Sequence, residues 1–221
     1  MNRMESFLKK YCTKEWQEFV SFHQQTLLFN EDEIIFREGE KVQGLYIISE
    51  GKAKVYSTNP DKKETIIRLA ADGHIIGHRG FGGDWIYPVS AKTYQKTTVI
   101  FIPLTIFNAV AKANVEFTYQ LMMFFAEELK QSERKSELIP VKNRIAKAIL
   151  MNYAVFGADQ KDSTKISYTI SRKDFASKTN TTYETVIRVL SDFNKENIIH
   201  LQSKSIRILD FDKLKKLSNS I

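Results

Sequence analysis

The chain has 221 residues, of which 43% are hydrophobic and 27% charged, and a net charge of +7. This length exceeds that of a typical single domain and predicts two domains. One cysteine, Cys12, excludes an intramolecular disulfide, a four-cysteine iron–sulfur cluster and a zinc finger. No apolar run approaches the roughly 20 residues of a membrane-spanning helix, and residues 1–18 lack the apolar core of a secretory signal. We therefore expect a cytoplasmic protein with no membrane partner.

The positive charge is confined to the C-terminal part of the chain. Residues 139–221 contain 15 basic and 8 acidic side chains, whereas residues 1–138 contain 18 of each. A small basic domain attracts phosphate backbones because its binding releases their condensed counterions. The charge distribution therefore predicts a nucleic-acid partner for the C-terminal part.

The N-terminal part changes from a helical to a strand-like pattern. Residues 1–25 mix apolar and charged side chains at helical spacing, which predicts one or two short helices. From residue 26 the period becomes two, and glycines separate the apolar runs. Eight short strands indicate a jelly-roll-like β roll, whose interior can hold a small ligand. The predicted strands are Thr26–Phe29, Glu33–Phe36, Gly44–Ser49, Lys52–Ser57, Glu64–Leu69, His74–Gly77, Ser90–Thr93 and Val99–Ile102.

A helical pattern returns from Thr105 to Leu138. A broad apolar stripe runs along it, and we do not expect the roll alone to cover so long and so aromatic a helix. Two copies are therefore expected to pair in a parallel coiled coil, although the stripe is not a regular heptad. Pro140 then breaks the helix and marks a hinge. The predicted dimer interface consists of Phe117, Leu121, Phe124 and Phe125.

The remaining segments predict a winged helix-turn-helix. Arg144–Val155 has helical spacing, Lys165–Ile170 alternates as a short strand, and Ile206–Leu209 fits a closing strand of a wing. The helix-turn-helix itself lies between these two strands, in Ser171–Asn194.

Within Ser171–Asn194, two apolar groups are separated by Asn180, a residue type that tolerates the left-handed backbone of a tight turn. Thr181 or Thr182 can then cap the second helix. The outer face of this helix suits a DNA groove, since arginine can bind guanine, glutamate can accept from cytosine and threonine can bind phosphate. The alternative is two ordinary amphipathic helices with a solvated face. The predicted DNA-binding residues are Arg172, Lys173, Thr181, Thr182, Tyr183, Glu184, Thr185 and Arg188.

Three segments together resemble a known family. FREGEKVQGLYIISEGKAKVY (36–56), RIAKAIL (144–150) and YETVIRVL (183–190) occur in the order found in the Crp/Fnr superfamily of bacterial transcription regulators. The resemblance implies an α+β fold, with a jelly-roll-like β roll of the cyclic-nucleotide-binding-domain type (1–104), a long dimerisation helix (105–138) and a winged helix-turn-helix (139–221). It also implies a homodimer on a palindromic DNA operator and, for an activator, contact with RNA polymerase.

The DNA end matches that family well. The resemblance places Glu184 and Arg188 where the family contacts base edges, and Thr185 where it holds a phosphate. Tyr183 departs from the arginine of the cyclic-AMP receptor protein. Because a phenol cannot bind guanine in a bidentate way, we expect a different half-site at that base.

The ligand end departs from the family pattern. Members that bind cyclic AMP use a Gly-Glu pair and, about ten residues later, an Arg-Ser pair. Here His78 follows Gly77 in place of the glutamate, and Tyr87 and Pro88 stand where Arg and Ser are expected. A buried phosphate without its cation loses several kcal/mol of solvation, so neither cyclic AMP nor another cofactor is expected. The candidate pocket for an unidentified effector consists of Gly77, His78, Arg79, Tyr87 and Ser90.

We therefore predict a homodimeric DNA-binding transcription regulator rather than an enzyme, controlled through the roll by an effector other than cyclic AMP. One alternative is a DNA-binding protein that needs no ligand. Another is a cupin-like enzyme in the roll, but His23, His74 and His200 show no metal-ligand spacing, and no metal site is expected. The sequence gives neither the operator nor the direction of regulation.

Overall fold

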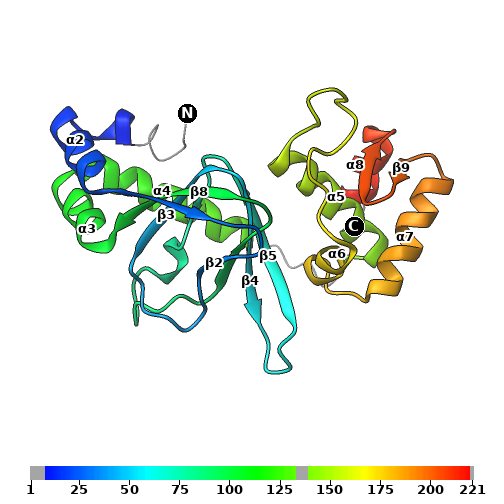
Figure 1. Ribbon diagram of the computed structural model, residues 1–221, viewed down its shortest axis with the longest axis horizontal. Coiled ribbons are helices and arrows are strands. Elements are labelled where there is room, and N and C mark those ends of the chain that lie inside the picture. Colours follow the sequence, from blue (N-terminus) through cyan, green and yellow to red (C-terminus); the bar gives the residue numbers. More distant parts are fainter. Residues whose placement is uncertain (1–7, 133–138, 220–221) are drawn as a thin grey trace. The chain divides into compact units, whose positions relative to one another are not determined.

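The computed structural model describes residues 8–132 and 139–219 (Figure 1). The chain divides into two compact units. One holds the chain up to Asp61 and Arg68–Arg134, and the other holds Lys62–Ile67 and the chain from Lys135 onward. Within the described ranges, no helix has the length and apolar character needed to cross a membrane.

The first unit is built on two four-stranded sheets, ordered β1-β8-β3-β6 and β2-β7-β4-β5. Strand β8 runs antiparallel to β1 and β3, and β7 runs antiparallel to β2 and β4. All eight strands lie where the sequence predicts them, which confirms the jelly-roll-like β roll. Their bounds are β1 Gln25–Phe29, β2 Ile34–Phe36, β3 Gly44–Glu50, β4 Lys52–Thr58, β5 Glu64–Ala71, β6 Ile75–Ile76, β7 Ser90–Thr93 and β8 Thr97–Pro103.

Strand β3 is apolar on both faces because both faces are covered. The side chains of Leu45 and Ile47 lie on the face of the sheet that the helices cover, and they belong to the core formed there. Tyr46 points the other way, toward the opposite sheet, where its ring stacks on Phe36 at 5.4 Å between centroids. The turn into β4 requires a glycine, because Gly51 has φ 126° and a β-carbon there would collide with Thr97.

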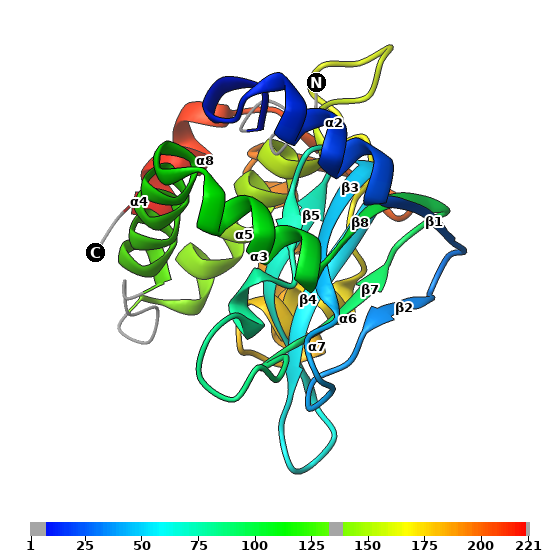
Figure 2. The same cartoon turned by 90° about the vertical axis from the view of Figure 1, so that its left-hand side faces the viewer.

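The first unit also contains the helices α2 Lys14–His23, α3 Leu104–Ala113 and α4 Val115–Ser132. Helices α2 and α3 contact each other and pack on strands β3 and β8 (Figure 2). The predicted continuous helix from 105 to 138 is wrong, because the chain breaks at Asn114, and residues 133–138 lie outside the described ranges. Asn114 is extended and buried. Its amide side chain donates to Val110 O (2.9 Å), and its own carbonyl accepts from Thr118 N (3.0 Å), so it ends α3 and starts α4.

The roll covers more of the aromatic stripe than the sequence suggested. Phe117 and Leu121 are buried in the core that also contains Val20, Phe107 and Val110. Phe124 and Phe125 are half-buried, packed against the same core and against the ring of His78. Phe117 and Leu121 are thus covered by their own domain, whereas Phe124 and Phe125 keep part of their surface exposed.

The second unit is a winged helix-turn-helix. It consists of α5 Val141–Phe156, α6 Arg172–Lys178, α7 Tyr183–Lys195, β9 Ile199–Gln202, β10 Ser205–Ile208 and α8 Phe211–Asn219. Strands β9 and β10 form an antiparallel hairpin, which is the wing, and α8 packs on α5.

The predicted strand at Lys165–Ile170 is wrong. Only isolated bridges form there, from Lys165 to Arg207 and from Ile166 to Ala158. The buried Asn152 takes over part of the hydrogen bonding, since its side chain donates to Tyr168 O (2.9 Å) and accepts from Ile170 N (3.1 Å). The segment is thus bonded partly to β10, where Ile166 N donates to Ile206 O (3.0 Å), and partly to this side chain.

Candidate nucleic-acid interface

The turn between α6 and α7 has the geometry that the sequence indicates. Asn180 has φ 46°, in the left-handed region. Thr182 rather than Thr181 caps α7, because its Oγ1 accepts from Thr185 N at 3.2 Å. Ser171 caps α6 in the same way, accepting from Asp174 N at 3.0 Å. Two caps and one left-handed residue therefore fix the angle at which α7 leaves the turn.

Helix α7 separates its residues sharply into two faces. Val186, Val189, Leu190 and Phe193 are buried against the rest of the second unit. The opposite face, which we call the free face of α7, consists of Tyr183, Glu184, Ile187 and Arg188, all exposed. Three of these four were predicted as DNA contacts, and Ile187 was not.

The threonines at the start of α7 are already hydrogen-bonded to one another. The hydroxyls of Thr182 and Thr185 lie 3.0 Å apart. Thr185 is half-buried, and Thr181 is half-buried before the helix begins. A phosphate bound by Thr185 would therefore have to share its hydroxyl with the cap.

Arg172 contacts the wing rather than pointing freely into solvent. Its Nη1 donates to Lys204 O, in the wing turn, at 3.3 Å. Burial lowers the pKa of this guanidinium from its ordinary value, and the neighbouring Tyr183 opposes that shift. Arg172 remains charged at any ordinary pH and ties the wing turn to the start of α6.

A groove of about 660 Å³ separates α7 from the wing. Tyr183, Ile187 and Leu201 provide apolar parts of its lining, and Arg172, Lys173 and Lys204 provide positive charge. Cationic walls beside an exposed helix face are what a duplex requires, since basic side chains neutralise phosphates while the helix enters the groove. Seven of the eight predicted DNA-binding residues lie on α6, α7 or the cap of α7, and Thr181 lies in the turn between them.

The predicted effector residues lie in and around the β roll, where Tyr87 fills the interior. Its side chain is 1% exposed and stacks on Phe36 at 4.4 Å. Its hydroxyl donates to Gly44 O and accepts from Gln43 N, both at 3.1 Å. Burial, followed by the nearby Tyr87, raises the pKa of Tyr46 from its ordinary value.

The role of the Tyr87 hydroxyl predicts a specific loss of stability. Tyr87→Phe is expected to lower the free energy of unfolding by about 1–3 kcal/mol, because the backbone groups of Gln43 and Gly44 lose a buried partner. Tyr183→Phe, at an exposed tyrosine, is a control with the same chemical change. Chemical denaturation measures both, and an unchanged midpoint for Tyr87→Phe would contradict the role of the hydroxyl.

The other predicted effector residues have different surroundings. His78 is buried with its ring stacked on Phe125, and Ser90 accepts from Glu38 N at 2.9 Å. Gly77 is buried against Tyr46, whereas Arg79 is exposed.

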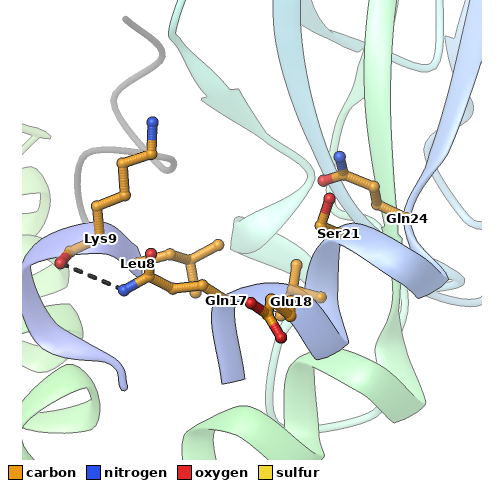
Figure 3. A pocket seen from close by; sticks show the side chains of 7 residues that line it. Leu8, Lys9, Gln17, Glu18, Ser21 and Gln24 are labelled. Atoms are coloured by element: carbon orange, nitrogen blue, oxygen red, sulfur yellow. Dashed lines mark hydrogen bonds between the residues drawn. The ribbon is translucent and has the colours of Figure 1, made fainter. Parts of the chain in front are cut away.

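A separate cavity of about 320 Å³ lies between residues 8–11 and α2 (Figure 3). Gln17 lines this cavity, and its side-chain amide donates to Lys9 O at 3.4 Å. None of the predicted effector residues lines it. Among the residues that the structure describes, no cluster of three or more His, Cys, Asp or Glu side chains could hold a metal ion.

Comparisons with known proteins identify both units. The cyclic nucleotide-binding domain family matches residues 26–114, and the Crp-like helix-turn-helix domain family matches residues 143–217. The chain is 25% identical over 193 residues to the CRP-like cAMP-activated global transcriptional regulator of Mycobacterium tuberculosis, covering 86% of each protein. It is 27% identical over 188 residues to the fumarate and nitrate reduction regulatory protein of Vibrio cholerae, covering 83% of this chain and 74% of the relative. The solved structure of FixK2 from Bradyrhizobium japonicum has a TM-score of 0.79 at 20% identity, covering 90% of this chain and 98% of that one.

Proposed function

Because the chain belongs to the Crp/Fnr superfamily of DNA-binding transcription regulators, we propose that it binds a palindromic operator as a homodimer, with one α7 in each half-site. The chain is a regulator and not an enzyme. Helix-turn-helix dimers contact successive major grooves on one side of the duplex, about 34 Å apart. A single α7 contacts too few base pairs for a specific site, so the proposal requires a surface that pairs two chains.

The observation that supports the dimer is a second apolar stripe on α4, distinct from the buried aromatic one. Val115, Tyr119, Met122, Ala126 and Leu129 are all exposed. They follow one another at spacings of four, three, four and three residues, the repeat of a coiled coil. We call this stripe the seam. Because the aromatic stripe already packs on the roll, the seam is the apolar face of α4 that remains for a partner.

A two-fold axis along the seam would bring two α4 helices together in parallel. Each seam residue would then meet the same residue of the second chain, as an isologous interface requires. In a two-fold dimer the two DNA-binding units are related by the same symmetry, so the operator they recognise is a palindrome.

Counting chains per duplex tests the dimer. Sedimentation of the protein with an operator-length duplex should give a complex of two chains and one duplex. Duplexes that contain a single half-site should bind the protein far more weakly. A complex of one chain with full affinity for a single half-site would contradict the proposal.

For the roll, we propose that it does not take up cyclic AMP. The argument rests on Tyr87, which stands in the sequence where the resemblance puts the phosphate-binding arginine. Its ring is buried, and its hydroxyl is hydrogen-bonded to Gly44 O. A cyclic phosphate would displace that ring and meet no replacement cation. This filling favours regulation by a different effector, or DNA binding that needs none.

Thermal unfolding tests the cyclic AMP proposal. A ligand that binds only the folded state raises Tm as its concentration increases. At 100 times Kd it adds about 2.7 kcal/mol to the free energy of unfolding. We expect no rise with cyclic AMP up to millimolar concentration, whereas operator DNA raises the Tm of the same sample. A concentration-dependent rise with the nucleotide would contradict the proposal.

A further inference from the structure

Ile187 is the one member of the free face of α7 with neither a charge nor a hydrogen-bonding group. It is 41% exposed, although the valines and leucine of the same helix are buried. It lies one turn after Tyr183, directly before Arg188 and three residues after Glu184. Residues at these spacings share one side of a helix.

This position constrains what Ile187 meets when the protein is on DNA. Glu184 and Arg188 cannot both reach base edges unless the turn that carries Ile187 also enters the major groove. Rising only about 1.5 Å per residue, α7 keeps the isoleucine close to any base pair that its neighbours contact. Its apolar atoms would then displace water from whatever group lies opposite.

The groups that face the major groove limit the choice. Purine N7, guanine O6, thymine O4 and the amino groups of adenine and cytosine all bind water, and an isoleucine against them would leave those groups without a partner. Thymine alone presents an apolar group, its C5 methyl. The polar side chains on either side of Ile187 favour a base-pair edge over a membrane or an apolar peptide.

We propose that Ile187 selects a thymine in each half-site by packing on its methyl group, next to the base pairs contacted by Glu184 and Arg188. This inference rests on the proposed DNA-binding role of α7 and specifies one base of the operator. The apolar part of the groove beside Tyr183 and Leu201 continues the same surface toward the wing.

Replacement of thymine by deoxyuridine tests the proposal, since it removes only the methyl. An operator is first obtained by selecting bound duplexes from a random pool. Each thymine is then replaced, one symmetric pair at a time, and the affinity of the protein is measured. We expect one symmetric pair to lower the affinity about 15-fold, which is about four-fold for each of the two methyl groups removed.

The variant Ile187→Ala gives the second arm of the experiment. It should fold with an unchanged Tm, because the side chain is exposed, and it should no longer distinguish thymine from deoxyuridine at that position. Sensitivity retained in Ile187→Ala would assign the methyl to another side chain and overturn the proposal. So would a wild-type protein that is indifferent to every methyl. Failure to bind any duplex would instead overturn the DNA-binding role of α7, and this inference with it.

Discussion

Met122→Glu is expected to convert the dimer to a monomer, whereas Met123→Glu, one residue further along α4, should leave it intact. Both methionines are exposed in the single chain, at 56% and 48%. Only Met122 lies on the seam, where the two-fold axis would bring two glutamates together without water or a counter-charge. An uncompensated buried charge costs about 3–5 kcal/mol, which corresponds to more than a hundred-fold weaker dimer.

Analytical ultracentrifugation of the three proteins measures this difference directly. The wild type and Met123→Glu should sediment as dimers at concentrations where Met122→Glu sediments as a monomer with an unchanged circular dichroism spectrum. The monomer should also lose most of its operator affinity. If both variants dissociate equally, or neither does, the seam is not the interface.

Arg188→Ala is expected to weaken operator binding by about 1–3 kcal/mol, or roughly 5- to 150-fold, and to relax base preference at one position of each half-site. The guanidinium stands on the free face of α7, where its two-pronged donor geometry matches a guanine edge. Its loss removes both charge and geometry.

Lys215→Ala removes a positive charge from α8, which packs on α5 instead of carrying the free face. Affinity for the operator and for operators altered at single base pairs is measured for both variants. The lysine variant should weaken all sequences slightly and equally. An Arg188→Ala protein that also weakens all sequences equally would show that Arg188 contacts phosphate rather than bases.

The roll and the helix-turn-helix could be predicted because their local signals agree with their packing. Glycines such as Gly51 mark turns that other residues cannot form, and Asn180 marks the helix-to-helix turn by its tolerance of positive φ. The break at Asn114 was missed because the apolar period continues across it. Asn114 ends α3 through a buried contact of its side chain that depends on the fold.

The proposed dimer surface shows why the apolar period of the sequence alone was insufficient. Helix α4 carries apolar side chains on two faces, and Phe117 and Leu121 form the more aromatic stripe. Sequence cannot say which face the same chain covers, and the burial of that stripe leaves the weaker, more regular seam around Met122 exposed. Ile187 was missed for a related reason, since an isoleucine is expected in a core until its exposure is seen.

The partners of individual polar groups also required the structure. Arg172 was predicted as a DNA contact, yet its guanidinium is bonded to the wing turn at Lys204. Tyr87 was predicted to line a pocket, yet it fills the interior through hydrogen bonds to residues more than 40 positions away in the chain. Such long-range pairings have no signature in local sequence.

Selection of duplexes from a random pool by the purified protein tests whether two copies of α7 recognise one symmetric site. We expect enrichment of a palindrome whose half-sites are centred about one helical turn, 34 Å, apart. Enrichment of an asymmetric site, or no retention of double-stranded DNA at low salt, would contradict it.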